Sequence, residues 1–90
     1  MTQINIDCRK IRSRVGAHRV FKEMLNFPDY YGMNLDALHD CRTETGELDI
    51  TLEHADRLEK RLHEYGETIL RVFEDSAMEN PGIKVTIYRD

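Results

Sequence analysis

The chain has 90 residues, of which 40% are hydrophobic and 33% are charged, with no tryptophan and a formal net charge of -4. This length supports one compact domain over residues 1–90, because two domains would each have too small a core. No apolar run approaches the roughly 20 residues of a membrane-spanning helix, and residues 1–7 lack the charged-then-apolar order of a secretory signal. We therefore expect a cytoplasmic protein that does not bind a membrane.

The first half of the chain predicts one strand and two helices. Residues 3–7 alternate apolar and polar side chains, as a half-buried strand does. Ser13 is a suitable N-cap for a helix that ends at Phe27-Pro28. Asn34 is a suitable N-cap for a second helix of about ten residues. The inward positions of these two helices are Ala17, Val20, Phe21, Met24, Leu25, Leu35, Leu38 and Cys41 or Arg42.

The second half predicts two more strands and two more helices. Residues 48–53 and 83–88 alternate as strands do, and a helix over residues 55–65 is expected to stop at Gly66. A fourth helix follows and ends at Asn80-Pro81-Gly82. The inward positions of these helices are Leu58, Leu62, Ile69, Leu70, Val72, Phe73 and Ala77.

The element order is strand, two helices, strand, two helices, strand. Strands that are joined by helical crossovers pair most readily in parallel. We therefore expect an α/β fold in which a three-stranded parallel sheet packs with four helices. The alternation in residues 48–53 and 83–88 further indicates that one face of the sheet is more exposed than the other.

The net charge is distributed unevenly along the chain. Residues 1–28 contain six basic and two acidic side chains, residues 29–56 contain one basic and eight acidic, and residues 57–90 contain six basic and seven acidic. A concentrated acidic charge attracts basic molecules and repels nucleic acid. The pattern therefore favours a basic protein partner and disfavours nucleic-acid binding.

The most unusual stretch is residues 27–41, which read Phe-Pro-Asp-Tyr-Tyr-Gly-Met-Asn-Leu-Asp-Ala-Leu-His-Asp-Cys. Gly32 is expected to take a positive φ just ahead of the second helix. Tyr30 and Tyr31 are rigid amphipathic rings of the kind that serve at interfaces. A tyrosine pair buried beneath a turn is an equally good interpretation of the same residues.

Asp36 and Asp40 are four residues apart, so on a helix their carboxylates share a face and repel each other by about 0.2–0.5 kcal/mol. The helix dipole favours Asp36 in the first turn but gives little to Asp40, which makes Asp40 the better candidate for contact with an outside cation. A solvated acidic face explains the pattern equally well.

A metal site or a catalytic site has less support. The four histidines, His18, His39, His54 and His63, show no zinc-ligand spacing. His39 beside the two aspartates leaves a small metal-dependent enzyme as an alternative, but no serine or cysteine stands nearby as an evident nucleophile. We expect no metal, no cofactor and no enzymatic activity. The two cysteines, Cys8 and Cys41, are expected to be reduced and buried.

The run of residues 27–41 resembles the signature of the barstar family, which is close to Leu-Pro-Glu-Tyr-Tyr-Gly-x-Asn-Leu-Asp-Ala-Leu-x-Asp. The similarity extends to Ile11-Arg12-Ser13, to residues 66–73 and to residues 83–88. The fold of that family, a three-stranded parallel sheet with four helices, agrees with the element order predicted above.

The resemblance implies an intracellular inhibitor of a basic, secreted microbial ribonuclease such as barnase. It also implies a chain that is monomeric when free and whose second helix and preceding loop enter the enzyme's active site. Asp40 would occupy the phosphate-binding subsite, Asp36 would add a second charged contact, and Tyr30 would pack against the catalytic histidine. This arrangement is physically reasonable because a carboxylate on a rigid helix imitates the phosphate that a cationic site binds.

Further contacts follow from the same resemblance. Asn34 and Thr43 would hydrogen-bond the rim of the enzyme site, while Asp75 and Glu79 match peripheral acidic positions of the family. His39 stands where the family has a tryptophan, so a large apolar contact is lost and a protonatable ring replaces it.

The segment after the second helix also departs from the family pattern, and contacts of residues 44–47 stay unassigned. These departures indicate a ribonuclease, or a related basic toxin, that matches this particular set of contacts. The alternative that remains is an acidic binding module for a basic protein that is not a nuclease.

Overall fold

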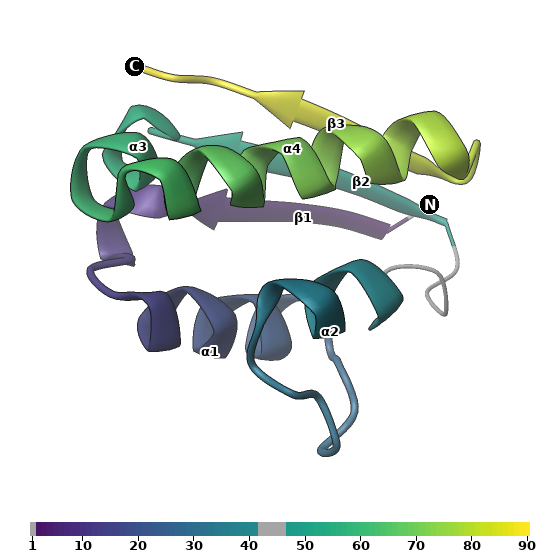
Figure 1. Ribbon diagram of the computed structural model, residues 1–90. Coiled ribbons are helices and arrows are strands. Elements are labelled where there is room, and N and C mark those ends of the chain that lie inside the picture. Colours follow the sequence, from purple (N-terminus) through teal and green to yellow (C-terminus); the bar gives the residue numbers. More distant parts are fainter. Residues whose placement is uncertain (1, 42–46) are drawn as a thin grey trace.

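The computed structural model describes residues 2–41 and 47–90, with the side chains of Asp40 and Cys41 outside the description. The elements in chain order are β1 (Thr2–Asp7), the 3-10 helix η1 (Cys8–Lys10), α1 (Arg14–Met24), α2 (Leu35–Cys41), β2 (Leu48–Glu53), α3 (Asp56–Leu62), α4 (Glu64–Glu79) and β3 (Ile83–Ile87). The three strands form a parallel sheet in the order β1-β2-β3 (Figure 1). The predicted α/β fold with four α-helices is confirmed, and η1 is an addition that the pattern did not indicate.

The sheet has one face that is covered by helices. Both crossovers step in the same direction, from β1 to β2 and from β2 to β3, and right-handed crossovers of this kind place their helices on one face. The strand residues that point toward the helices and are buried are Ile4, Ile6, Ile50, Leu52 and Ile83. Their neighbours Asn5 and Lys84 are exposed on the other face. The unequal faces that the alternation indicated are thus observed.

Helix α1 begins as predicted but ends earlier than predicted. The Ser13 side chain accepts a hydrogen bond from the backbone N–H of Gly16 at 2.9 Å, so Ser13 is the N-cap. The helix ends at Met24 rather than at Phe27-Pro28, because Asn26 takes a left-handed conformation with φ 55°. The Phe27 N–H then donates to the Lys22 carbonyl at 3.0 Å, which is the long hydrogen bond of a Schellman motif.

The inward face of α1 differs from the prediction at two positions. Ala17, Phe21 and Leu25 are buried as expected and Val20 packs against the core, but Met24 is exposed. The early end of the helix accounts for Met24, since it lies in the last turn, where the chain turns away. His18, which was not among the predicted inward positions, is completely buried.

The prediction that Gly66 stops the third helix is wrong, because Gly66 lies inside α4. The break between α3 and α4 is His63, which takes a φ of 54° and a ψ of -125°. Gly66 is buried against the backbone of α3, where a β-carbon would overlap the carbonyl group of Leu58. The glycine is therefore needed for the close approach of two helices and not for a turn.

The inward face of α4 is largely the predicted one. Ile69, Leu70 and Phe73 are buried, and the helix ends before Asn80 as expected. Val72 and Ala77 are only half-buried. Ser76, which was not predicted, is buried because its hydroxyl donates to the carbonyl of Val72 at 2.7 Å and so satisfies itself within the helix.

Cys8 is a free and buried thiol at the end of β1, as predicted. Burial raises its pKa to about 12, and the nearby carboxylates of Asp7, Asp56 and Glu53 act in the same direction. The prediction for Cys41 lies outside the described side chains. Within the described chain, every helix is too short or too polar to cross a bilayer.

Candidate partner-binding face

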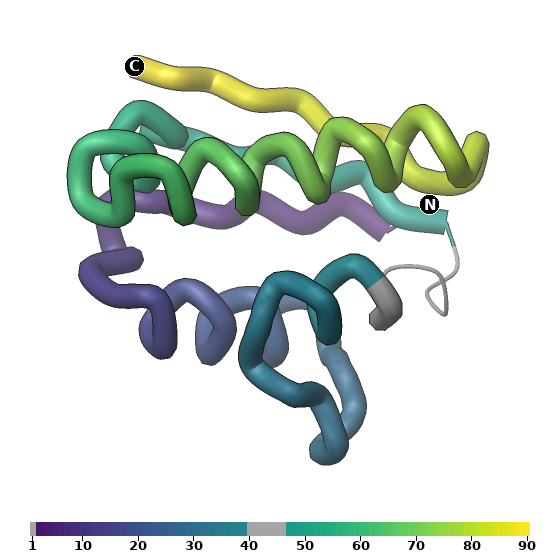
Figure 2. The backbone as a smooth tube through the Cα atoms, in the orientation of Figure 1, coloured from purple at the N-terminus to yellow at the C-terminus, as the bar shows by residue number. Residues whose placement is uncertain are grey.

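The loop between α1 and α2, residues 25–34, projects from the body of the molecule (Figure 2). Two residues with left-handed backbone, Asn26 at φ 55° and Met33 at φ 56°, stand near its two ends. Phe27 anchors the loop, since its buried ring packs against the Tyr31 ring with 4.8 Å between centroids. The loop thus leaves α1 sharply, extends outward and returns to start α2.

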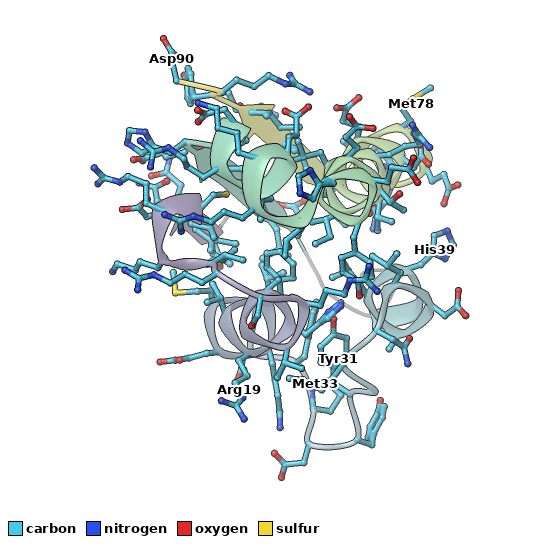
Figure 3. The ribbon with its side chains drawn as sticks, turned by 60° about the vertical axis from the view of Figure 1, so that its left-hand side comes forward. Arg19, Tyr31, Met33, His39, Met78 and Asp90 are labelled. Atoms are coloured by element: carbon cyan, nitrogen blue, oxygen red, sulfur yellow. The ribbon has the colours of Figure 1, made fainter. Side chains whose placement is uncertain are left out.

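The two tyrosines of the loop have opposite environments. Tyr31 points into the interior (Figure 3) and is only 5% exposed, whereas Tyr30 is 73% exposed. Both sequence interpretations are therefore correct for one tyrosine each, since the turn at residues 28–31 leaves Tyr30 exposed and Tyr31 buried. Tyr31 fixes the loop, and Tyr30 offers a large amphipathic ring to a partner.

The prediction for Gly32 is wrong, because the positive φ ahead of α2 belongs to Met33. Gly32 serves a different purpose. A β-carbon at this position would lie 3.3 Å from the β-carbon of Ala37 and 3.3 Å from the side-chain nitrogen of Asn34. A residue without a side chain therefore lets the loop fold closely against the first turn of α2.

Asn34 caps α2 as predicted. Its side-chain oxygen accepts a hydrogen bond from the backbone N–H of Ala37 at 2.8 Å, and its side-chain nitrogen donates to the Gly32 carbonyl at 3.1 Å. Leu38 is buried and holds the helix on the core, while Asp36 is exposed on the outer side. The same amide thus starts the helix and fixes the end of the loop.

The exposed residues of α2 point away from the body. His39 projects outward from the helix into solvent (Figure 3). The backbone of Asp40 lies in the last turn of α2. The predicted contact of its carboxylate with an outside cation lies outside the described side chains. Thr43 lies outside the described residues altogether.

Helix α4 contributes two more of the predicted residues. Leu38 of α2 lines a small apolar cavity together with Val72, Phe73 and Ser76 of α4, so the C-terminal half of α4 lies next to α2. Asp75 and Glu79 belong to this half and are exposed. We use the name "candidate face" for the exposed set from the loop, α2 and α4: Tyr30, Asn34, Asp36, His39, Asp75 and Glu79.

The sequence count implied that the acidic side chains of residues 29–56 form one concentrated charge. Among the described residues, several of these side chains lie away from the candidate face. Asp49 and Glu53 lie on β2, and Asp56 begins α3, where it pairs with Lys60 at 3.3 Å. Asp56 and Glu53 lie near Asp7, at the end of the sheet where β1 and β2 finish. The candidate face therefore takes its acidity from α2 and α4 and not from one continuous segment.

His18 connects the loop to the rest of the molecule, and the sequence pattern did not indicate this role. Its two ring nitrogens lie 2.6 Å from the hydroxyl of Tyr31 and 2.6 Å from the hydroxyl of Tyr65 on α4. Burial lowers the pKa of this imidazole below its usual 6.5. A single histidine at an apparently polar helix position gave no signal of this arrangement.

The side chains of the candidate face are of the kinds that bind another molecule through packing and hydrogen bonds. The face offers an aromatic ring, an amide that is used as a helix cap, and exposed carboxylates, which are groups that accept hydrogen bonds from cations. Among the residues that the structure describes, no three histidine, cysteine, aspartate or glutamate side chains come together as a metal-binding group.

The described residues form an α/β fold that exposes an aromatic ring and carboxylates on the candidate face. The comparisons with known proteins are more specific. The Barstar family, described as barstar (barnase inhibitor), matches residues 1–89. The chain is also 37% identical over 81 residues to "Putative ribonuclease inhibitor YrdF" of Bacillus subtilis (strain 168), which covers 88% of this chain and 89% of that protein. The chain belongs to the Barstar family, whose members are inhibitors and not enzymes.

Proposed function

We propose that this chain inhibits a basic, secreted ribonuclease of the barnase type by inserting α2 and the preceding loop into the enzyme's active site. The observation that carries the proposal is the arrangement of the candidate face within a member of the Barstar family. Tyr30 is exposed at the tip of a loop that Tyr31 anchors, and Asp36 is exposed on the capped helix that follows. A rigid aromatic group thus stands beside carboxylates that can replace an RNA phosphate.

The proposed contacts divide into a centre and a rim. Asp40 and Asp36 would face the cations that bind phosphate, and Tyr30 would pack on the catalytic histidine. Asn34, His39 and Thr43 would make surrounding contacts. Close, desolvated charge pairs slow the release of a complex, whereas charges at the rim mainly speed its formation. Asp75 and Glu79 on α4 would belong to this second group, since they add negative potential beside α2.

The identity of His39 favours a target that differs from barnase, either another ribonuclease or a related basic toxin. Its exposed imidazole is smaller than the tryptophan that the family resemblance places at this position, and it can carry a positive charge. The cognate enzyme would then present a smaller or less apolar surface opposite α2. The alternative function, binding of a basic protein or toxin that is not a nuclease, would use the same face without blocking an active site.

Titration of ribonuclease activity separates these functions. The chain should be added in increasing amounts to barnase and to the secreted ribonuclease that is encoded nearest to its own gene. The proposal predicts loss of RNA cleavage with a one-to-one endpoint, and competition between the chain and a mononucleotide for the enzyme. A complex that leaves RNA cleavage and mononucleotide binding unchanged would support the alternative and contradict the proposal.

A further inference from the structure

His18 makes the connection between three elements that are far apart in the sequence. It comes from α1, Tyr31 comes from the loop, and Tyr65 comes from the first turn of α4. The imidazole is completely buried, and each of its nitrogens lies 2.6 Å from a tyrosine hydroxyl. Both tyrosine rings also lie near the histidine ring, whose centroid is 5.8 Å from that of Tyr31 and 6.0 Å from that of Tyr65.

The neutral imidazole suits this pair of partners. In the neutral ring one nitrogen donates and the other accepts, so one tyrosine hydroxyl accepts a hydrogen bond and the other donates one. Burial disfavours the charged form of His18 and lowers its pKa. All three polar groups are thereby satisfied inside the core, where an unsatisfied group would be costly.

The position of this cluster relates it to the candidate face. Tyr31 directly follows Tyr30, and its backbone N–H donates to the Pro28 carbonyl at 3.0 Å, which closes the turn at the tip of the loop. Packing of Tyr31 on Phe27 would hold the ring without any hydroxyl. The hydroxyl adds a directional attachment to α1 through His18, and it sets the depth and orientation of the loop.

We propose that His18 is a positioning residue for the candidate face: it holds the loop carrying Tyr30 on α1 through the hydroxyl of Tyr31, while the hydroxyl of Tyr65 satisfies its other ring nitrogen. This inference rests on the proposed function for its consequence, since a loop that is ordered before binding loses less conformational entropy in the complex. The ordering itself is a property of the free chain and can be measured without an enzyme.

Two matched variants test the proposal. Tyr31→Phe and Tyr65→Phe each remove one hydroxyl from His18 and keep the ring, but only Tyr31 belongs to the loop. Amide hydrogen exchange of residues 27–34 should become about three- to tenfold faster in Tyr31→Phe, as expected for the loss of one net hydrogen bond. In Tyr65→Phe, exchange of the same residues should stay within about twofold of the unmodified chain, because the bond to Tyr31 remains.

Inhibition of barnase provides the second readout. Tyr31→Phe should raise the inhibition constant by about three- to tenfold, and this increase should be absent when Tyr30 is already replaced in Tyr30→Ala. Unchanged loop exchange in Tyr31→Phe, or equal acceleration in both tyrosine variants, would overturn the positioning role. Failure of the unmodified chain to inhibit both barnase and the secreted ribonuclease encoded nearest to its own gene would instead count against the proposed function, while the exchange result would still decide the role of His18.

Discussion

At the scale of single residues, the neighbours Tyr30 and Tyr31 have opposite roles, because Tyr31 is buried and anchors the loop whereas Tyr30 is exposed. That difference depends on His18, thirteen residues earlier on another element. A sequence pattern reports local periodicity, whereas the partner of a buried polar group is decided by tertiary packing.

His18 gives the first prediction, which concerns pH. The folded state holds this imidazole neutral and lowers its pKa below 6.5, so the unfolded chain binds the proton more readily. The stabilisation that comes from keeping His18 neutral is therefore fully present above pH 6.5, the pKa of the unfolded chain. It is lost as the pH falls through the lower pKa of the folded state. Urea unfolding between about pH 7.5 and pH 5 should show the free energy of unfolding falling more steeply for the unmodified chain than for His18→Gln. Parallel pH dependences of the two chains would contradict the assignment.

At the scale of elements, the strand spans and the two helix starts were predictable because their determinants are local. Ser13 and Asn34 are good caps in isolation, and they cap in the structure. The ends of α1 and α3 were not predictable, because they are set by non-glycine residues in left-handed conformations, Asn26 and His63. Gly66 was misread for the same reason: the close approach of α3 to α4 leaves no trace in the local pattern.

The two caps provide a matched comparison. Ser13→Ala and Asn34→Ala should each lower the free energy of unfolding by about 1 kcal/mol, because each exposes one backbone N–H at a helix start. Only Asn34→Ala should also weaken ribonuclease inhibition, since Asn34 fixes the loop end and the first turn of α2. Urea denaturation and inhibition assays on both variants measure the two effects. Equal inhibition constants for the two variants would show that the start of α2 does not matter for binding.

Gly66→Ala tests the interpretation of the junction between α3 and α4. A β-carbon at this position would overlap the Leu58 carbonyl group, and overpacking of this kind costs about 1–3 kcal/mol. The adjacent, exposed Glu67 supplies the control, since Glu67→Ala changes the same helix turn without a clash. Chemical denaturation of both variants should show a loss of stability in Gly66→Ala alone. A Gly66→Ala chain as stable as the Glu67→Ala chain would show that the two helices can separate without cost.

At the scale of the whole molecule, the fold brings the candidate face together from segments that are distant in the sequence. The loop and α2 precede β2, while Asp75 and Glu79 follow it on α4. The acidic residues counted along the sequence included Glu53 and Asp56, which lie at the end of the sheet where β1 and β2 finish and not on the candidate face. Charged residues that are close in the sequence form a binding surface only where the fold places them on the same face.

The most direct test of the central claim compares two variants of equal net charge. Asp40→Asn removes one negative charge from α2 inside the proposed interface, and Glu67→Gln removes one from the first turns of α4 outside it. Dissociation constants of the barnase complex should be measured for the unmodified chain and for both variants at the same ionic strength. The account predicts that Asp40→Asn weakens the complex by about thirtyfold or more, mainly through faster dissociation, while Glu67→Gln changes it by less than about threefold. Equal constants for the two variants, or an Asp40→Asn complex as tight as that of the unmodified chain, would contradict it.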